Sequence, residues 1–126
     1  MTTHPGKYNL YLYRGATFTR IITWKDKTGT LIDLTGFTAR LHMRETVDAA
    51  TPFLTLTTEN GGIALGGIAG TIALLATATA TAAITAMEGV YDLELIASDG
   101  VTIMRLIEGM VFVVPRMTPG LSSVDL

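Results

Sequence analysis

The chain has 126 residues, enough for one domain with a single hydrophobic core and too few for two. Its formal net charge is −2 and its Lys and Arg residues are not clustered in excess, which argues against a general nucleic-acid binder. It contains no cysteine, which excludes a disulfide framework, a thiolate nucleophile and a cysteine-bound metal.

The charge content is low for a protein of this size. Charged residues make up 16% of the chain, against about 25% in average globular proteins, while 48% of the residues are hydrophobic. A free monomer usually carries more charge on its surface. We therefore expect partner chains, including further copies of this one, to cover part of the surface.

The first part of the chain alternates between two sets of side chains, the pattern of half-buried strands. Residues 1–6 lack the basic region and apolar core of a signal peptide, so we expect no export by that route. Strands are expected at the following positions: 7–13, 16–24, 37–44 and 52–57, with a short strand or extended link over 30–34. Asp33 is expected to accept hydrogen bonds in a turn that ends at Gly36.

The middle of the chain, between Glu59 and Glu88, carries no charge. Its paired glycines have the spacing of packed membrane helices, but the segment lacks a sustained apolar run and basic anchors, so we expect no membrane span. Glycine turns around short strands near 63–65 and 71–75 explain the pattern better. Alanine-rich residues 77–87 predict one short helix, which the threonines weaken.

Residues 89–115 predict a β-hairpin, around which the rest of the chain is organised. Tyr91, Leu93 and Leu95 alternate with more polar residues, residues 99–100 (Asp-Gly) form the turn, and residues 101–114 return. Gly109 suggests a bulge or bend in the second strand, and Pro115 should end the pairing. Together these patterns predict one β-sandwich domain over 1–115, of about seven or eight strands, followed by a tail or arm over 116–126.

Six residues are candidates for a protein interface. Tyr11 and Tyr13 are aromatic side chains on the first strand, although such residues are more often core packing. Arg20 lies on an apolar stripe, where it is either an anchor for a partner or an edge residue whose head reaches water. Arg40, His42 and Arg44 share one face of the strand over 37–44, so we expect that outer face to be basic.

The inventory of reactive groups does not suggest an enzyme. The two histidines, His4 and His42, are far apart, and the carboxylates fall in turns or at outward strand positions. The spacing of calcium loops and the lysine of phosphate-binding loops are both lacking. We therefore expect neither a catalytic site nor a cofactor or metal site.

The turn and strand motifs resemble those of a family of small tailed-bacteriophage proteins. The motifs lie at 13–18 (Tyr-Arg-Gly-Ala-Thr-Phe), 24–26 with Gly29, 32–40, 91–95 with 99–100, and 105–109. Across residues 11–115 the chain is similar to the N-terminal domain of baseplate upper proteins. That resemblance implies an immunoglobulin-like antiparallel β-sandwich that docks receptor-binding machinery onto the tail. Larger members continue into helices or fibres, so direct presentation of a receptor binder and connection of other subunits both stay open.

The resemblance implies a virion structural protein made in the host cytoplasm. We expect an adaptor subunit of the tail or baseplate, which links the tail core to fibres or receptor-binding proteins and forms oligomers in that assembly. A decoration or cement protein on the capsid surface is the alternative. A carbohydrate-binding module that uses Tyr11, Tyr13 or Trp24 as a stacking platform is the third hypothesis.

Overall fold

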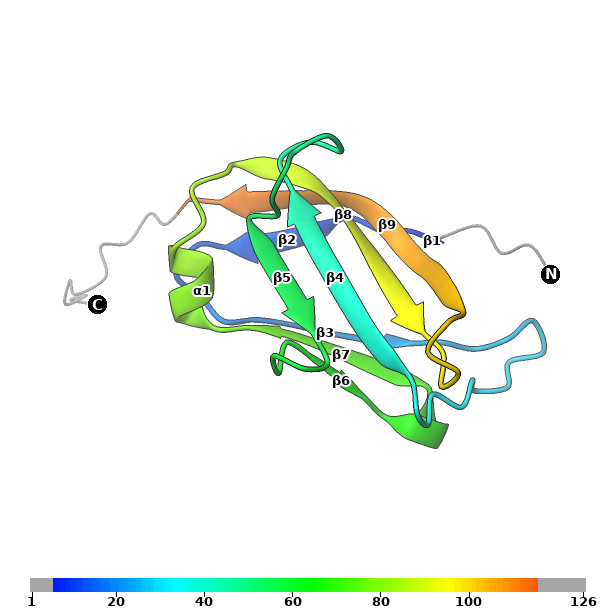
Figure 1. Cartoon of the computed structure of the whole chain (residues 1–126). Coiled ribbons are helices and arrows are strands. Elements are labelled where there is room, and N and C mark those ends of the chain that lie inside the picture. The colour runs from blue at the N-terminus through cyan, green and yellow to red at the C-terminus, as the bar shows by residue number, and fades with distance from the viewer. Residues whose placement is uncertain (1–5, 116–126) are drawn as a thin grey trace, which may run out of the picture.

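Two β-sheets pack face to face in the computed structural model, which describes residues 6–115 (Figure 1). The predicted tail over 116–126 and His4 lie outside the described residues. The elements are β1 (Gly6–Lys7), β2 (Leu10–Tyr13), β3 (Phe18–Thr23), β4 (Thr38–Arg44), β5 (Leu54–Thr57), β6 (Ile63–Leu65), a 3-10 turn η1 (Gly67–Ala69), β7 (Thr71–Ala76), α1 (Ala78–Ala82), β8 (Glu88–Ile96) and β9 (Ile103–Val114).

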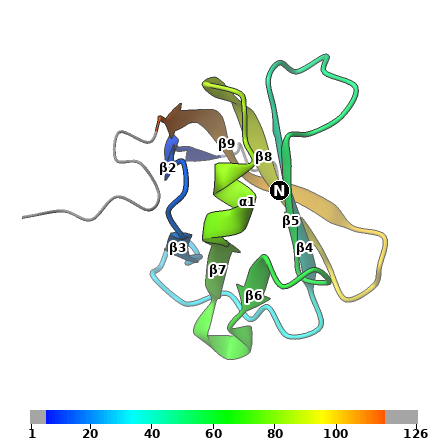
Figure 2. The same ribbon diagram turned by 90° about the vertical axis from the view of Figure 1, so that its left-hand side faces the viewer.

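The strands are divided unequally between the sheets. The larger sheet has the order β1-β9-β8-β4-β5, with β2 also paired with β9, and the smaller sheet has the order β3-β7-β6. Strands β1 and β2 run parallel to β9, whereas the other pairings are antiparallel. Figure 2 shows the smaller sheet on one side and β4, β5 and β8 on the other. The predicted all-β sandwich is confirmed.

The core lies between the sheets and follows the period of two. Strand β4 alternates half-buried and buried residues along its whole length, and β8 does the same after its first residue. The fully buried side chains of the larger sheet meet those of β7 from the smaller sheet. These are Leu10, Leu12, Leu41, Met43, Leu93, Leu95 and Val111, facing Ile72 and Leu74. The strong alternation explains why the sequence predicted these strands.

The predicted hairpin forms from β8 and β9, but its irregularity is not at Gly109. The register shifts after Leu93, so that Leu106 is the extra residue of a bulge in β9. Gly109 is instead a point of close approach, because a Cβ there would overlap the carbonyl oxygen of Tyr8. The expectation of a bulge at Gly109 was therefore wrong. The glycine lets the chain between β1 and β2 lie against β9.

The predicted helix over 77–87 is shorter than expected. Thr77 accepts a hydrogen bond from Ala80 N at 3.1 Å and begins α1, which ends at Ala82. Thr81 is fully buried and donates to the Ala16 carbonyl at 2.8 Å, so it fastens α1 to the turn before β3. The following residues bury Ile84 in the core instead of continuing the helix.

Aspartates accept hydrogen bonds in the turn before β4 and in the turn between β8 and β9. Asp33 accepts hydrogen bonds from Thr35 N at 2.9 Å and from the Thr35 hydroxyl at 2.6 Å, and Gly36 has a φ of 82°. Asp99 accepts from Thr102 N at 2.8 Å in the β8–β9 turn. The predicted turn role of Asp33 is confirmed. Both carboxylates accept hydrogen bonds within their own turns.

The close approach at Gly109 gives a first prediction. Gly109→Ala should lower the free energy of unfolding by about 2 kcal/mol, because the new methyl group must push the Tyr8 backbone away from β9. Chemical denaturation measures the change. Gly6→Ala is the matched control, since the nearest atom to its added Cβ is the flexible Ile107 Cγ2 at 3.3 Å. Equal stability of the two variants would contradict the proposed tight contact.

The turn aspartates give a prediction about acid. Hydrogen bonds lower the pKa of Asp26, Asp33 and Asp99 below the ordinary value of 3.8, chiefly those from Thr28, Thr35 and Thr102. The ionised carboxylates therefore stabilise the folded state fully above pH 3.8, and this contribution is lost as the pH falls through their lower folded-state pKa. Denaturation from pH 7 to pH 2 should show this loss. Asp99→Asn should flatten it, and Asp48→Asn, in an exposed loop, should not.

Candidate protein-interaction surfaces

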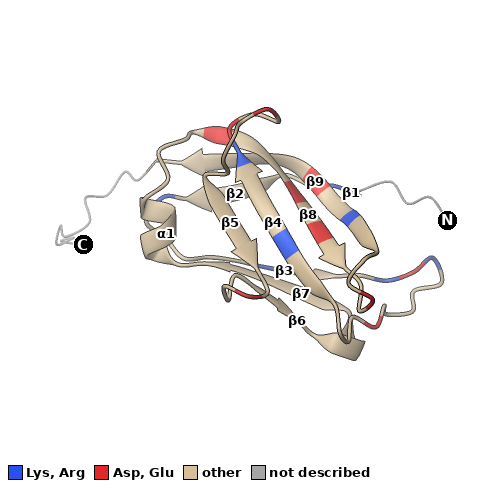
Figure 3. Cartoon of the chain, viewed as in Figure 1, with Lys and Arg blue, Asp and Glu red and all other residues tan. Residues whose placement is uncertain are grey.

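The outer face of the larger sheet carries paired charges of both signs. Arg40 Nε donates to Glu94 Oε1 at 2.8 Å, which joins β4 to β8. Arg105 on β9 lies 3.1 Å from an Asp92 oxygen and 3.6 Å from a Glu108 oxygen. Figure 3 shows these charges side by side on β4, β8 and β9. We call this surface the charged face.

The expectation that this face would be basic was wrong. The register places Arg40 opposite Glu94 and His42 opposite Asp92, so a row of carboxylates on β8 runs beside the cations of β4. Arg44 donates to the carbonyl of Ala49 at 3.0 Å and so holds the following loop. The pattern of one strand could not reveal this, because the neighbouring strand lies about 50 residues later in the sequence.

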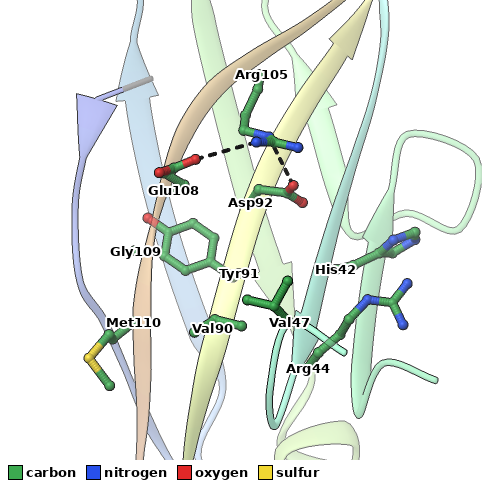
Figure 4. Close-up of a pocket in the computed structure, with 10 residues that line it drawn as sticks. All are labelled: His42, Arg44, Val47, Val90, Tyr91, Asp92, Arg105, Glu108, Gly109 and Met110. Carbon is green, nitrogen blue, oxygen red and sulfur yellow. Dashed lines mark ion pairs between the residues drawn. The ribbon is translucent and has the colours of Figure 1, made fainter. Parts of the chain in front are cut away.

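A hollow of about 360 Å³ lies on the charged face (Figure 4). Figure 4 shows His42 and Arg44 on one side, and Arg105 bridging Asp92 and Glu108 on the other. A hydrogen bond from Lys7, with the charges of Lys7 and Arg105, lowers the pKa of Glu108 and keeps it ionised. Both carboxylates are thus engaged by cations, and no group of three or more His, Asp and Glu residues arranged for a metal occurs among residues 6–115.

A second hollow, of about 440 Å³, follows the gap between β2 and β3. Tyr11, Tyr13 and Arg20 all line it, so the fold brings together three of the six candidate residues. The Tyr11 ring stacks on Phe112, with centroids 5.3 Å apart, and the Arg20 guanidinium lies over the Tyr8 ring at 4.5 Å from its centroid. Arg20 therefore lies on an edge strand, with its head beside an aromatic ring.

The stacking platform of the carbohydrate hypothesis is incomplete. Tyr11 and Tyr13 are more than half exposed and lie on the same side of β2. Trp24 is only partly exposed and packs against the core. The three rings do not form one exposed plane, so the feature that would favour glycan binding is not present.

The outer face of the smaller sheet has no charged side chain. It consists of Thr19, Ile21 and Thr23 of β3, Thr71, Ala73 and Leu75 of β7, and Ala64 of β6. We call this surface the neutral face. Ile21 is 69% exposed and Leu75 41%, and they are diagonal neighbours, because Ile21 pairs with Ala73 and Leu75 with Thr19. Exposed aliphatic groups without charges mark a surface suited to protein contact.

Sequence reasoning missed the neutral face. A usable signal was the lack of charge between Glu59 and Glu88, because that segment supplies β6 and β7. The other strand of this sheet, β3, lies much earlier in the chain, so the sequence alone did not show that its outward residues join the same surface. Within the described residues, no helix is long and apolar enough to span a membrane.

Comparisons with known proteins identify the fold. No protein-family model and no curated protein matches the chain. The extracellular domain of the voltage-gated sodium channel beta4 subunit, a parallel homodimer with a role in cell-cell adhesion, is 11% identical with a TM-score of 0.51, over 93% of this chain and 98% of that one. A chicken TCR is 10% identical with a TM-score of 0.54, over 93% of this chain and 56% of that one. The chain has an immunoglobulin-like β-sandwich fold.

Tyr91, beneath the charged face, gives a prediction for the joint between β1, β2 and β8. Its hydroxyl donates to the Tyr8 carbonyl at 2.6 Å. Tyr91→Phe should lower the free energy of unfolding by about 1–2 kcal/mol, because the carbonyl loses its donor. Tyr13→Phe is the control, since that ring is 59% exposed. An unchanged midpoint of denaturation in Tyr91→Phe would contradict a structural role for this hydrogen bond.

Titration reports the same group independently. Burial raises the pKa of Tyr91 to about 12, against the opposing charge of Arg20. In the wild type, ultraviolet absorbance should show one tyrosine that ionises near this value, and Tyr91→Phe should remove that step. The folded state disfavours the ionised ring, so the contribution of Tyr91 to stability is complete below pH 10 and is lost as the pH rises through about 12.

Proposed function

We propose that the chain is a structural subunit of a tailed-bacteriophage virion, which works as an adaptor at the tail or baseplate. It would link the tail core to fibres or receptor-binding proteins by binding other subunits through its surfaces. The motifs that resemble baseplate upper proteins support the setting. The immunoglobulin-like sandwich is the fold which that resemblance implies.

The neutral face is the observation that carries the adaptor role. Ile21 and Leu75 leave aliphatic surface in water side by side on a sheet face that carries no charged side chain. Burying such surface in a contact contributes about 25 cal/mol per Å² to the free energy of association. The charged face offers less, because its ions already pair with one another and exposed pairs contribute little.

The immunoglobulin-like frame itself is compatible with a contact role. The sodium channel beta4 domain uses a homodimer in adhesion, which is a property of that protein. At 11% identity the likeness shows the shared frame only. It supports the proposal to the extent that such a frame can work by contact without catalysis.

Location on the capsid, as a decoration or cement subunit, is the competing assignment. The neutral face suits either place, because both require contacts between chains. The two are separated by purifying tails and emptied capsids of the virus that encodes the chain and incubating each with tagged protein. Retention by tails supports the proposal, whereas retention by capsids alone would replace it with the decoration role.

A substitution on the neutral face tests the contact itself. Leu75→Asp should reduce retention by the particle at least tenfold, because it buries a carboxylate in an apolar contact. Val47→Asp is the matched control, since it changes an aliphatic residue that is 80% exposed in the loop after β4. Circular dichroism confirms that both variants are folded. Equal retention of the two variants would contradict a role for the neutral face.

A further inference from the structure

Strand β3 is an unprotected sheet edge. It pairs with β7 on one side and has no partner strand on the other among residues 6–115. It is six residues long, whereas the edge strands β5 of the larger sheet and β6 of the smaller sheet have four and three residues. Proteins commonly protect edges by shortening them or placing charges on them. The outward side chains of β3 are instead Thr, Ile and Thr.

The hydrogen-bonding groups at this edge can be assigned from the register. Trp24 N donates to Gly70 O at 2.9 Å, which directs the backbone groups of residue 24 toward the β7 side. Strand residues alternate in direction, so those of Thr19, Ile21 and Thr23 point away from β7. The residues with free backbone donors and acceptors are therefore also those whose side chains belong to the neutral face.

The order of these three residues is symmetric, since Thr-Ile-Thr reads the same in both directions. A two-fold axis between two antiparallel strands places one residue opposite its own equivalent, and each residue before it opposite the residue at the same distance after it on the other copy. We propose that β3 pairs antiparallel with β3 of a second copy, with Ile21 opposite its own equivalent. Thr19 of each copy then lies opposite Thr23 of the other. The two smaller sheets become one continuous sheet.

The pairing extends the neutral face across both copies. Aliphatic and threonine pairs directly across antiparallel strands are favourable by about 0.2–1 kcal/mol each. A single pair of strands buries less than the roughly 800 Å² per partner of a standard interface. We therefore expect a weak dimer in dilute solution, which many copies in one particle would reinforce.

Arg20 does not block the pairing. An inward charge on an edge strand can prevent such contacts, but the Arg20 guanidinium lies over the Tyr8 ring of its own copy. With Ile21 at the axis, Arg20 faces Ile22 of the second copy and not the other Arg20. The cation is held at the gap between β2 and β3, beside the hydrogen-bonding edge.

This inference rests on the proposed function in one respect: both use the neutral face. The inference adds how that face meets a second copy. Loss of retention in Leu75→Asp without any contact at β3 would leave the adaptor function standing and overturn the pairing. A contact at β3 together with unchanged retention of Leu75→Asp would support the pairing and contradict the role of the neutral face in the adaptor function.

Cross-linking tests the register. The chain contains no cysteine, so Ile21→Cys introduces a single thiol. Hydrogen-bonded antiparallel partners have Cα atoms about 5.5 Å apart, which lies within the range of disulfides. Mild oxidation of about 100 μM protein should give a covalent dimer at least tenfold faster than for Ile68→Cys. Ile68 is the matched control, since it is 77% exposed on η1 and away from this edge.

The flanking positions make the test specific. Thr19→Cys alone should not cross-link, because its equivalents lie about 14 Å apart across the axis. A mixture of Thr19→Cys and Thr23→Cys should cross-link, because those positions face each other. Linking of Thr19→Cys with itself, or equal rates for Ile21→Cys and Ile68→Cys, would overturn the pairing.

Sedimentation measures the contact without a covalent bond. Ile21→Lys places two cations opposite each other at the axis and should raise the dimer dissociation constant at least tenfold over wild type. Ile68→Lys should leave it unchanged. A wild type that stays monomeric up to 1 mM, or an Ile21→Lys variant that associates equally well, would also overturn the proposal.

Discussion

The position of β9 is the constraint on which the larger sheet depends, because this strand is paired along both edges. Its antiparallel partner is β8, and its parallel partners are the two short strands β1 and β2. The second edge closes only because Gly109 has no side chain where the Tyr8 carbonyl approaches. That same carbonyl accepts the hydrogen bond of Tyr91 from β8. One glycine and one buried hydroxyl therefore fix the segment between β1 and β2 against β9.

The two outer faces of the sandwich differ because their strands come from different parts of the sequence. Alternation on β8 places carboxylates outward next to the cations of β4 and β9, so the larger sheet neutralises its own charge. The smaller sheet draws two of its three strands from the segment between Glu59 and Glu88, which has no charge to place there. Only uncharged residues are thus gathered on the neutral face, and the charged residues of the described chain lie elsewhere. That asymmetry is what makes the neutral face a better candidate for contact than the charged face.

Local patterns predicted what depends on neighbours in the sequence. The alternation in β4 and β8, the turn at Asp99 and the capping by Asp33 are short-range features, and all are present. The features that were wrong depend on residues far away in the chain. The face of Arg40 is not basic because Glu94 lies beside it. The bulge is at Leu106, and Gly109 is instead the point where the Tyr8 backbone approaches β9. The sequence did not show that Tyr11, Tyr13 and Arg20 line one hollow, because that requires the sandwich to bring β2 beside β3.

The free edge of β3 follows from the same arrangement of the first strands. Because β1 and β2 are both held by β9, no part of the described chain before β3 remains to cover the edge of the smaller sheet. A sandwich with one sheet completed in this way leaves the other with an exposed row of donors and acceptors. Here that row borders an uncharged surface and carries the symmetric Thr19, Ile21 and Thr23. The contact that closes the larger sheet within one chain is therefore the reason why the smaller sheet is open to a second copy.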